Sequence, residues 1–246
     1  MAVERGGVAV VDPSARIRVD LGKISRILVG GAEPAVLDGA SGSGSVGSVL
    51  LIGLTGGIGA GKSSVSASLA RRGAVIVDAD AIVKELQQPG TEVFGEMVER
   101  FGPGIVAEDG SLDRAAIASV VFSDPDALAE LGAIVHPRVH AEIVRRVAEQ
   151  ADTDHVVVLD IPLLAEAGWP GLVGTIVVDL DPDVAVARLV AHRGFSESDA
   201  RNRIANQMER EHRLAKADLV IDNHGDPEAL EREVDRAWAW IHTLSP

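Results

Sequence analysis

The chain has 246 residues, with 37 acidic against 23 basic side chains and a formal net charge of −14, and this acidic excess disfavours nucleic acid as a partner. It contains no cysteine, which excludes disulfide bonds, thiolate metal sites and a cysteine nucleophile. No apolar run approaches the roughly 18–20 residues that span a bilayer, and the N-terminus lacks the apolar stretch of a secretory signal. We therefore expect a soluble cytoplasmic protein with no membrane partner.

Residues 1–48 differ in composition from the rest of the chain. They include the tract Gly39-Ala-Ser-Gly-Ser-Gly-Ser-Val-Gly-Ser48, and Gly/Ser tracts behave as flexible coil because they bury too little surface to offset chain entropy. We expect a mostly disordered N-terminal arm. A second hypothesis is that the true start codon lies at Val46 or Val49, so that the arm is an artefact of the gene model; the intact mass of the native protein distinguishes the two.

From residue 49 onward, short apolar runs alternate with helical patterns. Strands are predicted over residues 49–54, 74–77, 155–160, 174–180 and 219–221. Helices are predicted over 61–72, after Asp181-Pro182, from Ser196 and from Asp226-Pro227. Between residues 81 and 150 only helical pieces are predicted, interrupted at proline-containing turns, the last at His136-Pro137. The alternation predicts an α/β fold with a parallel sheet of about five strands flanked by helices.

Residues 56–63, Gly-Gly-Ile-Gly-Ala-Gly-Lys-Ser, match the phosphate-binding pattern G-x-x-x-x-G-K-[ST] between a predicted strand and a predicted helix. Glycines let backbone N–H groups surround a polyphosphate, and the helix N-terminus adds positive potential. We expect Lys62 to reach the β- and γ-phosphates and the Ser63 hydroxyl to bind Mg²⁺. The alternative is a chance match in a glycine-rich chain, but only four lysines occur in it. The loop alone leaves kinase, GTPase and motor open.

Further segments resemble, in order, those of the dephospho-CoA kinase family. The phosphate loop from Thr55 to Ser63 has the family's form, and Val77-Asp-Ala-Asp80, His136-Pro137, Pro162-Leu-Leu-Ala-Glu166 and Ile221-Asp-Asn223 follow at matching places. The resemblance covers about residues 49–244. Ser64 stands where the family often has threonine, Ala165 where an aromatic residue is common, and the arm has no counterpart. The resemblance implies a phosphate-loop kinase with a helical substrate-binding insert at about 81–150 and a helical lid at about 188–214.

The resemblance implies transfer of the ATP γ-phosphoryl group to the ribose 3′-hydroxyl of dephospho-CoA, the final step of coenzyme A synthesis. Lys62, Asp80, Arg188 and Arg193 are its candidate catalytic residues. Asp80 is the candidate general base, because it follows the second strand at the edge where open α/β sheets bind ligands. The alternative for Asp80 is a helix N-cap.

The remaining candidate residues divide by ligand. Those expected to bind ATP are Gly57, Ile58, Gly59, Ala60, Gly61, Lys62, Ser63, Ser64 and Asn223, the last as a reader of the adenine edge. Those implied for the acceptor are Thr55, Asp78, Arg114, His136, Arg138, Pro162, Leu163 and Glu166, although His136 has a cap or turn as its alternative. Ser63 and, through water, Asp160 are the candidate Mg²⁺ ligands; a strand-terminal loop role is the alternative for Asp160.

The predicted lid is locally basic, with six arginines between residues 188 and 213. Arginine forks bind phosphate oxygens, and Arg188 and Arg193 are the best candidates, whereas we interpret Arg201 and Arg213 as solvated. Two other functions stay open: a nucleoside- or shikimate-type kinase, and a non-catalytic nucleotide-binding module. A GTPase is disfavoured because no Asn-Lys-x-Asp motif occurs. We expect a monomer or a weak homo-oligomer.

Overall fold

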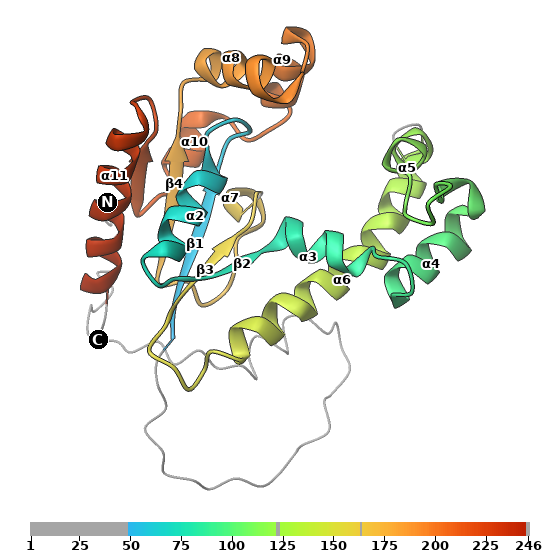
Figure 1. The fold of residues 1–246 in the computed structure, drawn as a ribbon, viewed down its shortest axis with the longest axis horizontal. Helices are drawn as coiled ribbons and strands as arrows, with labels where there is room; N and C mark the ends of the chain where they lie inside the picture. The colour runs from blue at the N-terminus through green and yellow to red at the C-terminus, as the bar shows by residue number, and fades with distance from the viewer. Residues whose placement is uncertain (1–48, 122–123, 163, 245–246) are drawn as a thin grey trace, which may run out of the picture.

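The computed structural model describes residues 49–121, 124–162 and 164–244, and the predictions made for residues 1–48 lie outside this range (Figure 1). Its centre is a five-stranded sheet in the order β2-β3-β1-β4-β5, with every neighbouring pair parallel. The strands are β1 (Leu50–Gly56), β2 (Val75–Asp78), β3 (Val156–Asp160), β4 (Gly174–Asp179) and β5 (Leu219–Asp222). The α/β fold predicted from the sequence is therefore confirmed.

The helices are more numerous in the described part of the chain than the sequence pattern indicated, because α7 and α10 are only four and five residues long. They are α2 (Lys62–Arg71), α3 (Ala79–Leu86), α4 (Glu92–Phe101), α5 (Arg114–Val121), α6 (Pro125–Ala148), α7 (Leu164–Ala167), α8 (Pro182–Arg193), α9 (Glu197–Ala205), α10 (Arg210–Leu214) and α11 (Pro227–Thr243), with a 3₁₀ turn, η1, at Pro103–Ile105.

Two apolar layers enclose the sheet. On one face α2 and α11 pack against the strands, around fully buried Ile52, Ile176 and Ile241. On the other face α3 and α6 cover β2 and β3, around Leu51 and Leu159. Strands that are covered on both faces must be apolar throughout, which explains the continuous runs seen in the sequence. Because all neighbouring strands are parallel, their carboxyl ends meet at one edge, where β2 to β5 each end in an aspartate beside the loop that follows β1.

The helices α3–α6 form a unit to one side of the sheet, with a core of its own around Val93, Met97, Ile105 and Val135 (Figure 1). The sequence predicted an interruption at His136-Pro137, and this prediction is wrong: α6 continues through Pro137. An internal proline removes one helical hydrogen bond, here the one to the carbonyl of Ala133. Burial of Val135 and Ile143 on either side of it keeps the helix continuous.

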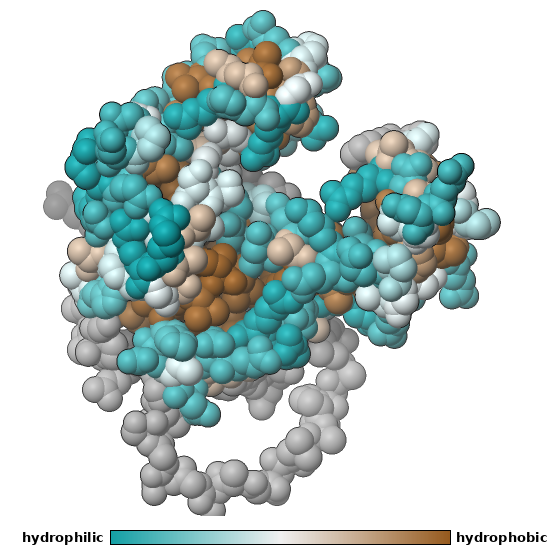
Figure 2. Space-filling model, viewed as in Figure 1, coloured by the Kyte–Doolittle hydropathy of each residue, from teal (hydrophilic) through white to brown (hydrophobic). Residues whose placement is uncertain are grey.

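The helices α8 and α9, which we call the lid helices, rise from the carboxyl edge of the sheet (Figure 1). Ser196 caps α9 by accepting a hydrogen bond from the Asp199 N–H at 3.1 Å, as its spacing predicted. Figure 2 shows an open hollow between the lid helices and the unit α3–α6, with largely hydrophilic surfaces on both sides. Within the described residues, none of the helices combines the length and apolar character required to cross a bilayer.

Candidate active site

The phosphate-binding loop connects β1 to α2 at the carboxyl edge of the sheet. Gly59 and Gly61 adopt φ values of 80° and 91°, a left-handed region that residues with a Cβ rarely enter. Gly61 is the N-cap residue of α2, and no side chain caps this ten-residue helix. Its first N–H groups and its dipole therefore face the loop, where an anion would satisfy them.

Lys62 and Asp160 form an ion pair at the base of this loop. Asp160 is 3% exposed at the end of β3, and it also accepts a hydrogen bond from the hydroxyl of Ser66 on α2. A buried carboxylate needs such partners, since desolvation is costly without them. The ammonium group of Lys62 is thereby held at the loop by a carboxylate from the neighbouring strand.

Asn223 closes the loop from the opposite side of the sheet edge. It follows β5, is 6% exposed, and its Nδ2 donates to the carbonyl of Ala60 at 2.7 Å. A Cβ built on Gly61 would overlap this Nδ2, so the glycine is also required by close approach. Arg188 on α8 donates to the carbonyl of Asn223 at 2.9 Å. Sequence reasoning predicts that Asn223 contacts the adenine; in the structure its amide donates to the loop backbone, and the residue also lines the cleft beside the loop.

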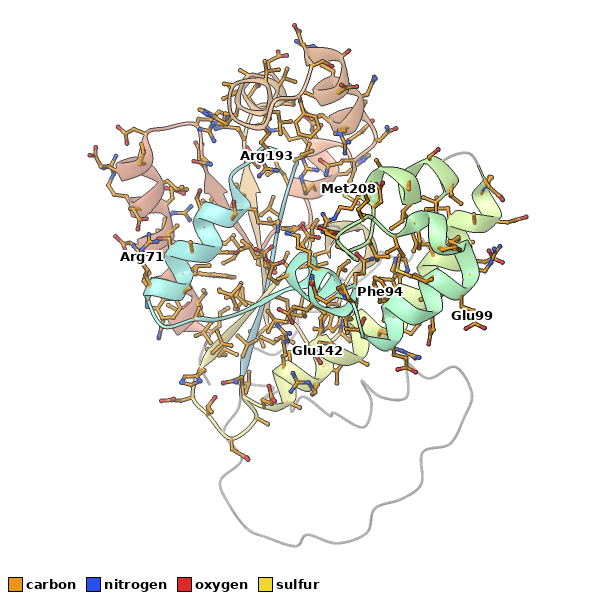
Figure 3. All side chains as sticks on the ribbon, turned by 45° about the vertical axis from the view of Figure 1, so that its right-hand side comes forward. Arg71, Phe94, Glu99, Glu142, Arg193 and Met208 are labelled. Atoms are coloured by element: carbon orange, nitrogen blue, oxygen red, sulfur yellow. The ribbon has the colours of Figure 1, made fainter. Side chains whose placement is uncertain are left out.

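A cleft of about 580 Å³ opens beside the loop, between α2, α8 and the connection from β5 to α11. The loop contributes Gly59 and Gly61 to its wall, and the first turn of α2 contributes Ser63 and Ser64, both exposed. Arg188 and Arg193 line it from α8. Arg193 lies between the lid helices and the sheet (Figure 3). The cleft therefore joins the loop's N–H groups to two of the arginines that the sequence singled out.

Asp78 and Asp80 lie where β2 meets α3, next to the site. Asp78 is the N-cap residue of α3 and accepts from the Ala81 N–H at 3.1 Å. The capping role that was the alternative for Asp80 thus belongs to Asp78. Asp80 lies in the first turn of α3 and is exposed. Register pairs Asp78 with Asp160, which places the ends of β2 and β3 side by side.

Comparisons with known proteins agree with this geometry. A family model described as dephospho-CoA kinase matches residues 50–228. The dephospho-CoA kinase of Streptomyces avermitilis is 52% identical over 192 residues, which cover 78% of this chain and 93% of that protein. The chain belongs to the dephospho-CoA kinase family. The dephospho-CoA kinase of Symbiobacterium thermophilum is 48% identical over 190 residues, which cover 76% of this chain and 80% of that protein. The crystal structure of TT1252 from Thermus thermophilus superposes with a TM-score of 0.67 at 37% identity, covering 78% of this chain and 97% of that one.

Residues that the dephospho-CoA kinase resemblance assigned to the acceptor occupy varied environments. Thr55 is fully buried, and its hydroxyl donates to the carbonyl of Pro162 at 3.0 Å. Leu163 lies outside the described residues. Glu166 belongs to α7, and its side chain is likewise not described.

On the unit α3–α6, three more of these candidates are spread apart. Arg138 turns toward α4, where its Nη2 lies 2.7 Å from the Glu96 carboxylate and 3.1 Å from that of Glu92. Arg114 is exposed in the first turn of α5, and His136 is exposed on α6 without forming a turn. None of these three side chains lines the described cleft beside the phosphate-binding loop.

Sequence reasoning assigned no site role to the segment that follows α9 and interpreted Arg213 as solvated, whereas this side chain is half-buried and bonded to the Met208 carbonyl. Arg210 makes two hydrogen bonds to the Asp179 carboxylate, at 2.8 and 2.6 Å, and these hold the pKa of Asp179 below its usual value. Gln207 accepts a hydrogen bond from the Ile58 N–H at 2.8 Å. The Arg213 guanidinium lies against Gly57. A spacing of three residues between Arg210 and Arg213 was the available signal, since it places both on one side of a helix.

Proposed function

We propose that the chain transfers the γ-phosphoryl group of ATP to the ribose 3′-hydroxyl of dephospho-CoA, giving coenzyme A and ADP. The observation that carries this proposal is the phosphate-binding loop with its Lys62–Asp160 pair, in a chain that matches the family from residue 50 to residue 228. Phosphoryl transfer depends on positioning and on neutralising charge, and a loop of N–H groups with a lysine and nearby arginines supplies both.

We assign the triphosphate to the loop N–H groups of residues 57–61, Lys62, Ser63 and Ser64. The cleft beside them takes the remainder of the nucleotide, with Arg188 and Arg193 on its wall. Because Asn223 supports the Ala60 carbonyl, we assign it to holding the loop that binds ATP rather than to contact with the base. Arginine side chains on lid helices reach phosphate oxygens when the lid closes over them, so α8 and α9 are assigned that movement.

A magnesium ion fits the donors present. Ser63 offers one exposed hydroxyl and Asp160 one carboxylate, and Mg²⁺ typically takes few protein ligands, keeping water and substrate phosphates in its shell. Bound there, the ion would neutralise charge on the β- and γ-phosphates. Both Asp160 oxygens already accept hydrogen bonds from Lys62 and Ser66, so we assign Asp160 to act through water.

We assign Asp80 as the general base. Its carboxylate is exposed at the carboxyl edge of β2, and the capping bond of α3 is made by Asp78 instead. The 3′-hydroxyl oxygen attacks the γ-phosphorus while its proton passes to Asp80. The bond from the γ-phosphorus to the β–γ bridging oxygen breaks, and ADP leaves with that oxygen. The unit α3–α6, whose first helix carries Asp80, is proposed as the acceptor-binding insert, with Arg114, His136 and Arg138 as its candidate contacts.

We further propose that the enzyme acts in the cytoplasm, as a monomer or weak homo-oligomer, on small molecules rather than on nucleic acid or membranes. The acidic net charge of −14 supports this choice of partner.

The test is an ADP-release assay with dephospho-CoA beside adenosine, AMP, shikimate and pantetheine. We expect turnover with dephospho-CoA and coenzyme A as the product detected by mass spectrometry, and loss of nearly all turnover in Lys62→Ala. Turnover with shikimate or a nucleoside alone would favour the rival kinase class. ATP binding without turnover on any acceptor would favour a non-catalytic module.

A further inference from the structure

The segment from Gln207 to Arg213 contacts the first half of the phosphate-binding loop, away from the cleft. A Cβ built on Gly57 would lie 3.0 Å from Nη2 and 3.5 Å from Cζ of Arg213, and 3.7 Å from Oε1 of Gln207. The absence of a Cβ at Gly57 lets the guanidinium lie this close to the loop without crowding. Arg188 and Arg193 line the cleft at Gly59 and Gly61, so arginines approach the loop from two directions.

The Arg213 guanidinium is held in this position from several sides. Its Nη1 donates to the carbonyl of Met208 at 2.9 Å. The helix that carries it is fixed by the two bonds from Arg210 to Asp179 at the end of β4. A bidentate arginine–carboxylate pair fixes orientation as well as distance. Met208 lies below the lid helices (Figure 3), on the segment that returns from the lid.

The loop itself is joined to the same segment at Ile58. Its N–H donates to Gln207, and its side chain packs against the lid cluster of Leu189 and Ala200. Ile58 is therefore in contact with both lid helices, and its bond to Gln207 ties this half of the loop to the segment that carries Arg213. Gln207 holds the loop, whereas Arg213 brings a positive charge to it.

We propose that Arg213 contacts the terminal phosphoryl group of ATP at Gly57, and that Gln207 positions this half of the loop when the lid closes. The proposal rests on the proposed function, and it assigns to Arg213 a role that differs from those of Arg188 and Arg193. A guanidinium at the outer phosphate stabilises the charge that spreads over its oxygens during transfer. Arg213 is then a catalytic residue and Gln207 a positioning residue.

The test compares ligands that differ only at the outer phosphate. Binding of ADP and of the non-hydrolysable β,γ-imido analogue of ATP is measured by calorimetry for the wild type, Arg213→Gln and Arg213→Lys, with Arg201→Gln as control. Arg201 is a lid arginine whose partners, Asp183 and Glu197, are both exposed. We expect Arg213→Gln to lower kcat about 100-fold. It should also weaken binding of the ATP analogue while leaving the affinity for ADP unchanged. Arg213→Lys should have a kcat and an affinity for the analogue between those of the wild type and Arg213→Gln, and Arg201→Gln should match the wild type in both.

Equal changes in affinity for ADP and the analogue, or no change in either affinity, would overturn the catalytic role of Arg213. Its role would then be the structural hydrogen bond to the Met208 carbonyl. If Arg213→Gln does not fold, Arg213→Lys alone carries the comparison, because lysine keeps the positive charge but lacks the planar fork of arginine. This variant should again bind the analogue more weakly while keeping its affinity for ADP. Equal weakening of ADP binding and analogue binding would again overturn the proposal. For Gln207, Gln207→Glu retains an acceptor for the Ile58 N–H and should keep turnover better than Gln207→Ala. The proposed function fails separately, if the wild type makes no coenzyme A from dephospho-CoA.

Discussion

Replacement of Asn223 by alanine separates support of the loop from recognition of the base. The change removes the 2.7 Å hydrogen bond to the carbonyl of Ala60, a residue that is 3% exposed. A buried carbonyl left without a partner costs about 1–3 kcal/mol. We expect the free energy of unfolding to fall by about 2 kcal/mol, at the middle of that range, with weaker binding of ATP and GTP alike because both use the same loop.

Gly61→Ala extends this prediction into a double-mutant cycle. Alone, this substitution should lower the free energy of unfolding by about 1–2 kcal/mol, because alanine disfavours the left-handed conformation of residue 61. The overlap of its Cβ with the Asn223 amide should lower the free energy of unfolding further. In the Asn223→Ala background that overlap is absent. The double variant should therefore lose less free energy of unfolding than the sum of the losses in the two single variants. Urea denaturation measures the free energy of unfolding of the wild type and of each variant. An unchanged free energy of unfolding in Asn223→Ala, together with lost preference for ATP over GTP, would refute the reasoning and return Asn223 to the adenine.

Two further expectations concern catalysis and pH. Asp80→Asn should depress kcat strongly while the calorimetric affinity for ADP stays near the wild-type value, because an exposed side chain that caps nothing contributes little to the fold; comparable turnover would remove Asp80 from the role of base. Hydrogen bonds from Arg145 lower the pKa of Glu142 from 4.5 to about 2 (Figure 3 places Glu142 on α6), so this carboxylate contributes stability above pH 4.5 that is lost as the pH falls toward 2. Glu142→Gln should therefore be less stable than the wild type at pH 7, with a difference in melting temperature that narrows below pH 4.5; a constant difference would contradict this.

Anchoring of the lid at both of its ends is a consequence of the sheet order. The lid helices leave after β4 and return before β5, and these strands are neighbours. Near the departure point, the Asp181 N–H donates to His224 Nε2 at 2.8 Å; near the return point, Arg210 binds Asp179. Both attachments lie outside the lid helices. The connections on both sides of the lid helices are therefore held at the same edge of the sheet.

The sequence alone determined the parts of this protein that depend on local pattern. Apolar runs marked the strands because each is covered on both faces, and the spacing of glycines, Lys62 and Ser63 marked the phosphate-binding loop. Asp181 and Asp226 preceded proline, and each caps the helix that begins there. These features require only a few consecutive residues, and they were sufficient for the fold class and the family resemblance.

The tertiary structure decided which side chains complete the site. Asn223 reaches Ala60 across 163 residues, and Gln207 reaches Ile58 across 149. Neither contact has a local pattern, because each depends on which strands lie next to one another and on where the lid returns. The single-residue choice of Asp78 over Asp80 as the cap, and the passage of α6 through Pro137, likewise followed from packing. Local propensity permits several arrangements at such positions, and burial against distant segments selects one of them.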